Sequence, residues 1–317
     1  MTYFVSGDLG LYFRRGWTHG VLAIAIWPFL LAGALTLLDR ILGRSRARFG
    51  ALLWLSLLAV ATHPALDWLN NYGMRWLMPL DGRWFYGDAV FIIDPWIWLG
   101  LGGAVFLVTS RGAFRFGAWA LGAAPPSFLV MAAVPGLLPG KLLFAAGLVA
   151  FAVARAKRLP RTESGRERLN RAALALVSAY VLGMAALSSF ANRWTREKLE
   201  ADGHEVERLM VAPTPMTPFT RDVVFATPSS YRYGSLTIGP SIELALSSEE
   251  IERNEWSPFA IRALRRPEVR GFALWARFPW AEIEKEPGGF RVTLRDARYS
   301  RGRGSDGFGT EVVFLPD

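Results

Sequence analysis

Two histidines and an aspartate in the first quarter of the chain have the types and spacing that could bind a metal ion. His63 and Asp67 are four positions apart, and His19 lies in the short sequence Thr18-His19-Gly20. Residues four apart on a helix share one face, so an imidazole and a carboxylate there can bind the same divalent ion. The chain has no cysteine, which limits metal ligands to His, Asp and Glu. We therefore predict a divalent metal site formed by His19, His63 and Asp67.

The same residues also have a structural interpretation. A histidine ring nitrogen donates or accepts a hydrogen bond as readily as it binds a metal, so internal hydrogen bonding is the alternative for each histidine. Pro64 complicates the helix, since the residue before a proline avoids helical backbone angles. A short new helix that begins at Pro64 would still keep His63 and Asp67 close together.

Four further charged residues are candidates for roles around this site. Asp88 and Asp94 are each a candidate for an additional ligand or a general base. Arg14 and Arg15 are candidates to contact an anionic substrate. The structural alternatives are that Asp94 caps a helix, that Asp88 lies in a turn, and that the arginines are interfacial anchors.

The N-terminal part of the chain has the composition of a membrane protein. Hydrophobic residues make up 52% of the whole chain, and its mean hydropathy is +0.23. A helix needs about 20 apolar residues to cross a bilayer, because lipid offers no partner to an unpaired backbone group. The sequence predicts six spans, at residues 21–38, 51–66, 95–109, 117–138, 142–154 and 172–191. An alternative makes residues 117–154 one re-entrant hairpin, which leaves the end of the chain on the same side.

Lysines and arginines between these spans predict how the chain is oriented. Residues 1–191 contain 18 Lys and Arg against 8 Asp and Glu, whereas residues 192–317 contain 18 against 19, so the net charge of +9 arises in the N-terminal part. The cations concentrate in loops 39–50, 110–116 and 155–171, which fall on one side of a six-span topology. Because cations favour the cytoplasmic side, the C-terminal part is predicted to be extracytoplasmic. Cations between apolar spans also indicate membrane lipids as partners, not nucleic acid.

Residues 192–317 form a second predicted domain, which is small and β-rich. Short segments rich in Val, Phe, Leu and Thr alternate with Gly and Pro, and we predict strands at residues 206–211, 222–227, 231–238, 272–278, 290–296 and 311–315. We also predict an exposed helix at 192–202, an extended linker at 212–218 and a helix that begins at Ser257-Pro258. The predicted fold class is therefore an α-helical polytopic membrane domain, residues 1–191, followed by an α+β extracytoplasmic domain.

Several motifs together resemble the YdjM-type inner-membrane proteins, a family of metal-dependent hydrolases. These motifs lie at residues 14–19, 62–73, 79–80, 83–88 and 93–96, and in the C-terminal part at 275–279 and 294–299. The resemblance implies a membrane-embedded zinc site in which His19, His63 and Asp67 match the family's motif positions. A more distant similarity to zinc-dependent phospholipases C, in which a His-x-x-x-Asp pair binds zinc, implies hydrolysis of a phosphoester.

Two departures from the family pattern leave a second interpretation of the function. Many relatives have His-Arg-Gly-x-Thr-His, and Arg14 stands where the first of these histidines would be. Relatives also tend to carry an Asp-rich segment before the position of Tyr3. The first interpretation is a hydrolase of the bacterial inner membrane that acts on a phosphoester or lipid-type substrate at the outer interface. The second is a non-catalytic envelope protein whose β-rich domain binds a partner and whose His/Asp cluster is structural.

Overall fold

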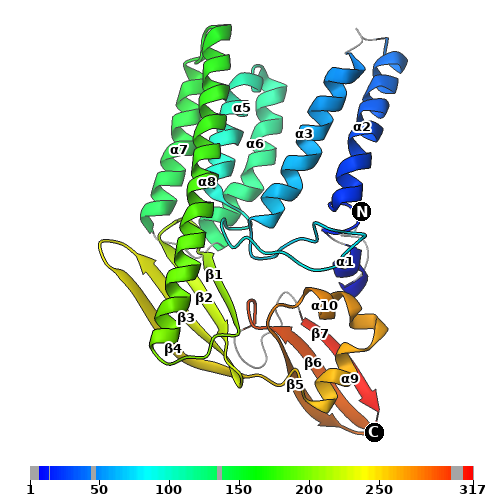
Figure 1. Ribbon diagram of the computed structural model, residues 1–317. Helices are drawn as coiled ribbons and strands as arrows, with labels where there is room; N and C mark the ends of the chain where they lie inside the picture. Colours follow the sequence, from blue (N-terminus) through cyan, green and yellow to red (C-terminus); the bar gives the residue numbers. More distant parts are fainter. Residues whose placement is uncertain (1–6, 14, 44–47, 134–137, 301–309, 317) are drawn as a thin grey trace.

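The computed structural model describes residues 7–13, 15–43, 48–133, 138–300 and 310–316. Helices stand side by side in one half of the molecule, and two antiparallel sheets lie below them (Figure 1). The helical half consists of α2 (Val21–Ile41), α3 (Phe49–Trp68), α4 (Pro95–Ile97), the π-helical η2 (Trp98–Gly102), α5 (Gly103–Thr109), α6 (Ala113–Phe128), the π-helical η3 (Leu129–Ala133), α7 (Leu138–Ala156) and α8 (Glu163–Ala201). The short helix α1 (Gly7–Phe13) precedes them and lies below them (Figure 1). A helical N-terminal region followed by a β-rich C-terminal region is thus confirmed.

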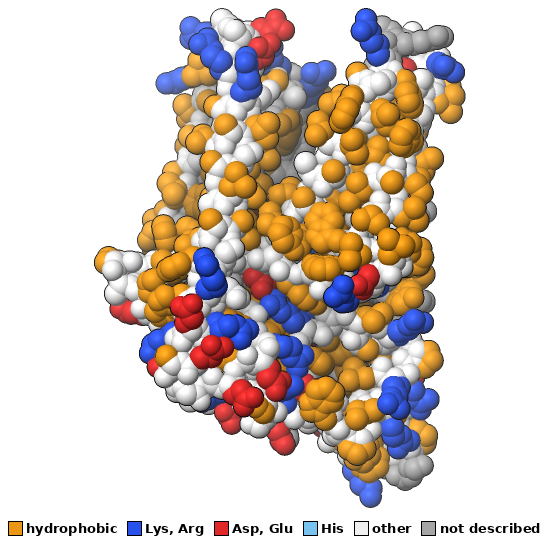
Figure 2. Space-filling model, viewed as in Figure 1, with side chains coloured by type: hydrophobic (Ala, Val, Ile, Leu, Met, Phe, Trp, Pro, Cys, Tyr) orange, Lys and Arg blue, Asp and Glu red, His pale blue; other side chains and the backbone are white. Residues whose placement is uncertain are grey.

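Four of the described helices are long and apolar enough to cross a membrane: α2, α3, α7 and α8. Most of their side chains are not buried, and hydrophobic side chains cover the visible face of the helical half (Figure 2). α4, η2 and α5 together form a shorter apolar segment, Pro95–Thr109, and η3 continues α6 without a break. Helical segments therefore lie at all six predicted positions. The number that crosses a membrane stays a prediction.

Prolines alter two of the predicted helices. α3 runs through Pro64, so no new helix begins there and His63 and Asp67 lie on one continuous helix. α7 begins at Leu138, four residues earlier than predicted, and includes Pro139 in its first turn. Proline suits that position, because its missing N–H would have no helical acceptor there. At 19 residues, α7 is long enough to be a candidate span.

Two antiparallel sheets form the C-terminal part. The first has the order β1-β2-β3-β4, with β1 (Arg208–Pro213), β2 (Thr220–Ala226), β3 (Ser230–Ile238) and β4 (Ile242–Glu252). The second has the order β5-β6-β7, with β5 (Pro279–Glu286), β6 (Gly289–Asp296) and β7 (Thr310–Pro316). Between the two in sequence lie α9 (Pro258–Leu264), the 3-10 turn η4 (Pro267–Val269) and α10 (Arg270–Trp275). Ser257 caps α9 by accepting a hydrogen bond from the backbone N of Ala260, which confirms the predicted helix start.

Three predictions for this part were wrong. Residues 272–278 begin inside α10 and are not a strand, because Phe272 and Trp275 reach the core with helical spacing. Strands β4 and β5 were missed, since several glutamates in each interrupt the hydrophobic pattern. Residues 212–218 are not a linker: they lie in the hairpin between β1 and β2, where Met216 is buried against Phe144 of α7.

The helix predicted at residues 192–202 exists as the end of α8; most of it is exposed as predicted, but one stripe is buried. Ala191, Thr195 and Leu199 are fully buried, and two of them share a core with the first sheet. Their spacing of four places them along one stripe of the helix. α8 therefore joins the helical half to the first sheet as one continuous element.

The N-terminal segment and the long loop after α3 pack against the second sheet. Leu11 of α1 and Tyr72 of the loop share a hydrophobic core with Phe272 and Trp275 of α10. The Tyr86 hydroxyl donates to the carbonyl of Trp275 at 3.0 Å, and the Trp275 indole donates to the carbonyl of Tyr72 at 3.2 Å. Residues on both sides of the predicted domain boundary thus build a common core.

A fully buried ion pair lies at the same junction. Arg298 donates to the two carboxylate oxygens of Asp296, each at 2.9 Å, and its Nη1 donates to the carbonyl of Asn71 at 2.7 Å. Burial by itself would raise the pKa of Asp296, but Arg298 and the backbone N–H groups that bond the carboxylate hold this pKa below its usual value. This pair ties β6 to the loop after α3.

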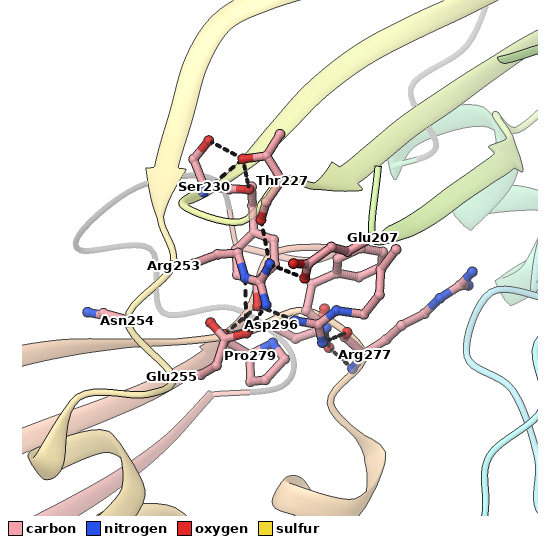
Figure 3. A network of polar contacts seen from close by, with 12 residues as sticks. Glu207, Thr227, Ser230, Arg253, Asn254, Glu255, Arg277, Pro279 and Asp296 are labelled. Atoms are coloured by element: carbon pink, nitrogen blue, oxygen red, sulfur yellow. Dashed lines mark hydrogen bonds and ion pairs between the residues drawn. The ribbon is translucent and has the colours of Figure 1, made fainter. Parts of the chain in front are cut away.

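A second polar network joins the two sheets (Figure 3). Arg253, which follows β4, donates to Glu255 at 2.9 Å and to Glu207 at 2.5 Å. Asn254 makes paired hydrogen bonds with the backbone N and O of Ala281 on β5, at 2.8 and 2.6 Å. These contacts hold the second sheet in place against the first sheet. They thereby also fix the position of the core that the second sheet shares with α1 and the loop after α3.

Candidate metal centre

His19, His63 and Asp67 lie together at the end of the helical half that is nearer the sheets. α3 carries His63 and Asp67 close to its C-terminal end, and the turn that leads into α2 carries His19 (Figure 1). The Nε2 atoms of His19 and His63 lie 3.6 and 3.8 Å from the same Asp67 oxygen, Oδ2. Each residue offers one ligand atom within 4.8 Å of the other two. The structure therefore brings the three predicted ligands together.

The two His–Asp separations fit a single ion after small side-chain movements. Zinc binds nitrogen and oxygen ligands at about 2.0–2.2 Å, so two ligands of a tetrahedral ion lie about 3.4 Å apart. The two His–Asp separations exceed this value by only a few tenths of an ångström. The His63 side chain is 67% exposed, whereas those of His19 and Asp67 are 18% exposed. Three protein ligands with one open side are the arrangement of catalytic zinc sites, which keep a position for water or substrate.

Outer contacts orient two of the three candidate ligands. The Thr18 hydroxyl lies 2.6 Å from Nδ1 of His19, and when it accepts the Nδ1 proton, Nε2 keeps its lone pair for a metal. Nη2 of Arg15 lies 3.1 Å from Oδ1 of Asp67, which leaves Oδ2 facing the histidines. Burial lowers the pKa of His19, partly opposed by Asp67, and so favours the neutral imidazole that binds metals.

Arg15 is held inside the protein by the loop after α3. Its Nη1 donates to Oδ1 of Asn70 at 3.0 Å and to the carbonyl of Gly73 at 3.2 Å, and its guanidinium lies 4.4 Å from the centre of the Tyr72 ring. Together with the ion pair to Asp67, these contacts let Arg15 hold the segment before α2 against the end of α3 and the loop that follows it. Its predicted contact with an anionic substrate stays a prediction, and Arg14 lies outside the described residues.

Two glycines allow the close chain contacts on which the site depends. A Cβ atom on Gly20 would lie 2.5 Å from the carbonyl oxygen of Met78, so a side chain there would displace the neighbouring His19. Gly73 has a φ of +81°, and a Cβ there would lie 2.5 Å from the Tyr86 ring. Both motif glycines therefore have a packing role that is independent of metal chemistry.

Asp88 pairs with the β-rich part and not with the candidate ligands. Nη1 of Arg277 donates to both Asp88 carboxylate oxygens, at 2.8 and 3.1 Å, and Nη2 donates to the carbonyl of Leu209 at 2.6 Å. Ser188 of α8 donates to the Asp88 carbonyl at 2.7 Å. Asp88 thus links the loop to α8 and the first sheet. Among the described residues, the ion-pair partner of its carboxylate is this arginine, outside the His/Asp cluster.

Asp94 caps the helix that follows it, which was the structural alternative predicted for this residue. Its Oδ1 accepts hydrogen bonds from the backbone N of Trp96 and of Ile97, at 3.0 and 3.1 Å. Its Oδ2 accepts from the hydroxyl of Tyr180 on α8 at 2.8 Å. Burial raises the pKa of Asp94, and these hydrogen bonds oppose that effect. The structure does not bring Asp94 into contact with the three candidate ligands in the part of the chain that it describes.

Two residues beside the site were not singled out from the sequence. Asn70 accepts hydrogen bonds through Oδ1 from Arg15 and from the backbone N of Tyr72, and so closes the turn after α3. Arg75 is 2% exposed, and its guanidinium donates to the carbonyl of Tyr12. For Arg75, the available sequence signal was a single arginine inside an apolar run. When such a charge is buried, it must be paired with polar groups.

Comparison with known proteins agrees with the resemblance seen in the motifs. No match was found among curated proteins or among solved structures. Residues 2–136 match the family model described as YdjM inner membrane protein, and this range includes His19, His63 and Asp67. The motifs at 275–279 and 294–299 lie beyond the matched range, so their resemblance stays a prediction. Through residues 2–136, the chain matches the YdjM inner membrane protein family, as its motifs predicted.

Proposed function

We propose that this protein is a membrane-integral, metal-dependent hydrolase in which His19, His63 and Asp67 bind one divalent ion. The observation that carries the proposal is the convergence of three ligand atoms within 4.8 Å, from two segments that are far apart in the sequence. Zinc is the ion we expect, since two imidazoles and one carboxylate are a donor set of catalytic zinc sites. A bound zinc ion would supply Lewis acidity toward a phosphoester and lower the pKa of a water molecule.

The position of the cluster favours a phosphoester or lipid-type substrate. The cluster lies at the ends of two apolar helices, which is the depth of lipid headgroups when such helices cross a bilayer. The exposed side of His63 is the approach that we assign to the substrate. Arg15 is already occupied by Asp67 and the loop, which leaves Arg14 as the arginine we assign to the substrate anion. The contacts of Asp88 and Asp94 favour structural roles, so we assign no general base.

We further propose six passages through the bacterial inner membrane, with the β-rich part outside the cytoplasm. The described cations of the three basic loops lie at the end of the helical half opposite the sheets, where blue side chains gather in Figure 2. Such cations favour the cytoplasmic side. α6 and η3 together span 21 residues, about 31 Å as a helix, which is enough to cross. The segment Pro95–Thr109 is about 22 Å long and requires local thinning of the bilayer.

One observation favours the alternative function, a non-catalytic envelope protein. The Arg15–Asp67 ion pair neutralises the carboxylate, so Asp67 does not need a metal ion to be stable. In this alternative the cluster only holds α2, α3 and the loop together, and the β-rich part binds a partner.

Metal analysis of the full chain, purified in detergent, distinguishes the two functions. We expect about one zinc ion per chain after dialysis, and loss of most of it in the His63→Ala and Asp67→Asn variants. His204→Ala is the matched control, because it removes a histidine that lies beside Arg232 in the first sheet. If the wild type retains no more zinc than these two variants, even after zinc has been offered, the metal site is rejected.

Hydrolysis needs a separate measurement. The zinc-loaded chain is offered bis(p-nitrophenyl) phosphate and, in a second assay, phosphatidylglycerol vesicles. We expect cleavage that is lost in His63→Ala and kept in His204→Ala. Zinc binding without cleavage of either compound would keep the metal site and reject the phosphoester hydrolase.

A further inference from the structure

A cavity of about 740 Å³ lies within the helical half, apart from the candidate metal centre. Its walls come from the segment Pro95–Thr109, from α6 and η3, and from α7. The lining is almost entirely apolar, with aromatic rings that include Trp98, Phe106, Trp119 and Phe151. The volume lies within the range of sites that bind small molecules.

The cavity exists because α6 stands away from its neighbours. α7 packs closely on α5 and η2 through glycines: a Cβ on Gly103 of α5 would lie 2.3 Å from the ring of Phe151, and one on Gly147 of α7 would lie 2.5 Å from Leu99 of η2. By contrast, α6 has no buried residue, and a Cβ on Gly122 would meet no atom within 4 Å. The space beside α6 is therefore bounded by two helices that cannot move closer to fill it.

Both π-helical segments of the described helices border this cavity. η2 contributes Trp98, Leu99 and Gly102 to the lining, and η3 contributes Val130. π-helical turns are rare, and they occur frequently at functional sites. Their presence on two walls of one cavity is independent support for a binding site.

One end of the cavity lies beside basic groups. Phe116 lines the cavity, and the guanidinium of Arg155 lies 4.2 Å from the centre of the Phe116 ring. Arg115 is the exposed neighbour of Phe116 in α6, and Arg111 lies in the turn before that helix. In the described part of the chain, two of these arginines bond backbone carbonyls and not acidic side chains: Arg155 donates to the carbonyl of Ser110 at 3.1 and 3.2 Å, and Arg111 donates to that of Pro160 at 3.1 Å. Their charge can therefore attract an anion at the mouth of the cavity.

We propose that the cavity binds one acyl chain of an anionic phospholipid, whose phosphate lies at Arg111, Arg115 and Arg155. The apolar lining suits the chain, and the wall from Ile97 to Phe106 extends about 14 Å along a helix. Arginines near a membrane surface attract anionic headgroups. The arginines lie at the end of the helical half opposite the His/Asp cluster, so this lipid is not the proposed substrate. Its chain would fill the space between α6 and the pair formed by α5 and α7.

Native mass spectrometry of the full chain in detergent tests this proposal. The chain is titrated with dioleoyl phosphatidylglycerol and, separately, with dioleoyl phosphatidylcholine. We expect one tightly bound phosphatidylglycerol, with an affinity at least about fivefold higher than that of phosphatidylcholine. Arg115→Gln should weaken phosphatidylglycerol binding and reduce this preference, because it removes one positive charge beside the headgroup. Equal affinities of the wild type for the two lipids would overturn the proposal.

Leucine substitutions at glycines test the acyl-chain part of the site. Gly122→Leu places a side chain in the cavity and should weaken phosphatidylglycerol binding at least about tenfold. Gly117→Leu is the control on the same helix, because Gly117 also meets open space but does not line the cavity. Leucine favours a helix more than glycine does, so neither change should disturb α6. Gly102→Leu fills the cavity from η2 and replaces the first variant if that variant does not fold. Wild-type binding by a folded cavity variant would overturn the proposal.

Discussion

Replacement of Asp88 by asparagine removes one charge at the junction between the helical and β-rich parts. Asparagine keeps the shape of the side chain and tolerates the φ of +47° at this position, so the change adds little backbone strain. The Asp88 and Arg277 side chains are only 7% and 16% exposed. In the variant, Arg277 would face one neutral acceptor where it now bonds two carboxylate oxygens.

The expected loss of stability follows from these contacts. Leaving one charge of a buried pair without its partner costs about 3–5 kcal/mol. Asparagine retains one acceptor, and Arg277 keeps its bond to the carbonyl of Leu209, so the cost should fall at or below the lower end of this range. We expect Asp88→Asn to reduce the free energy of unfolding by about 2–3 kcal/mol. With Arg277→Gln already present, Asp88→Asn should cost much less, because the two groups are directly coupled.

Denaturant unfolding of the detergent-solubilised chain, followed by tryptophan fluorescence, measures this effect. Asp81→Asn is the matched control, since Asp81 lies in the same loop and its ion pair with Arg83 is at the surface. Its substitution should leave the unfolding midpoint nearly unchanged. Equal midpoints for the two variants would refute the reasoning. Loss of bound zinc from a fully stable Asp88→Asn variant would instead assign Asp88 to the metal site.

Three further predictions concern other contacts of the same chain. Asp296→Asn should cost about 3–5 kcal/mol, because it leaves a fully buried arginine without its carboxylate. Folding lowers the pKa of Asp296, so the ionised carboxylate contributes its full stability above the unfolded pKa of about 3.9. This stability is lost as the pH falls through the lower folded pKa. An acid titration in which the variant loses as much stability as the wild type would contradict this. Gly20→Ala should reduce zinc retention in metal analysis, whereas Gly33→Ala, where a Cβ meets open space, should not; equal zinc content would argue against the packing role. Leu199→Ala should cost about 2–5 kcal/mol in denaturant unfolding and Leu182→Ala far less, because the first side chain is fully buried and the second is 70% exposed; similar losses would be inconsistent with the packing of α8.

The candidate metal ligands illustrate what local sequence can predict. His63 and Asp67 share a helix face because their spacing is close to one helical turn, and this holds in α3 even though Pro64 lies between them. His19 was predicted as a ligand from a motif, since no spacing rule connects a residue before α2 with one at the end of α3. The outer contacts made by Thr18 and Arg15 could not be predicted, because they depend on how two chain segments meet.

The errors in the C-terminal part have a similar cause. Strands such as β6 were predictable, because Phe290, Val292 and Leu294 alternate with polar residues along the strand, although the polar face is largely buried as well. β4 lies at the edge of its sheet and is largely exposed, so its sequence lacks that alternation. The segment with Phe272 and Trp275 is hydrophobic in either conformation, and its helix is stabilised by packing in the common core.

The sequence by itself determined the helical segments, most of the strands and the types of residue available for chemistry. These features depend on hydrophobic patterns over a few neighbouring residues. Only the tertiary structure decided which group each buried carboxylate contacts: Asp88 pairs with Arg277 across 189 positions, and Asp94 accepts a hydrogen bond from Tyr180 across 86. A buried charge must find a partner wherever the fold brings one within reach, and sequence distance carries no information about that encounter.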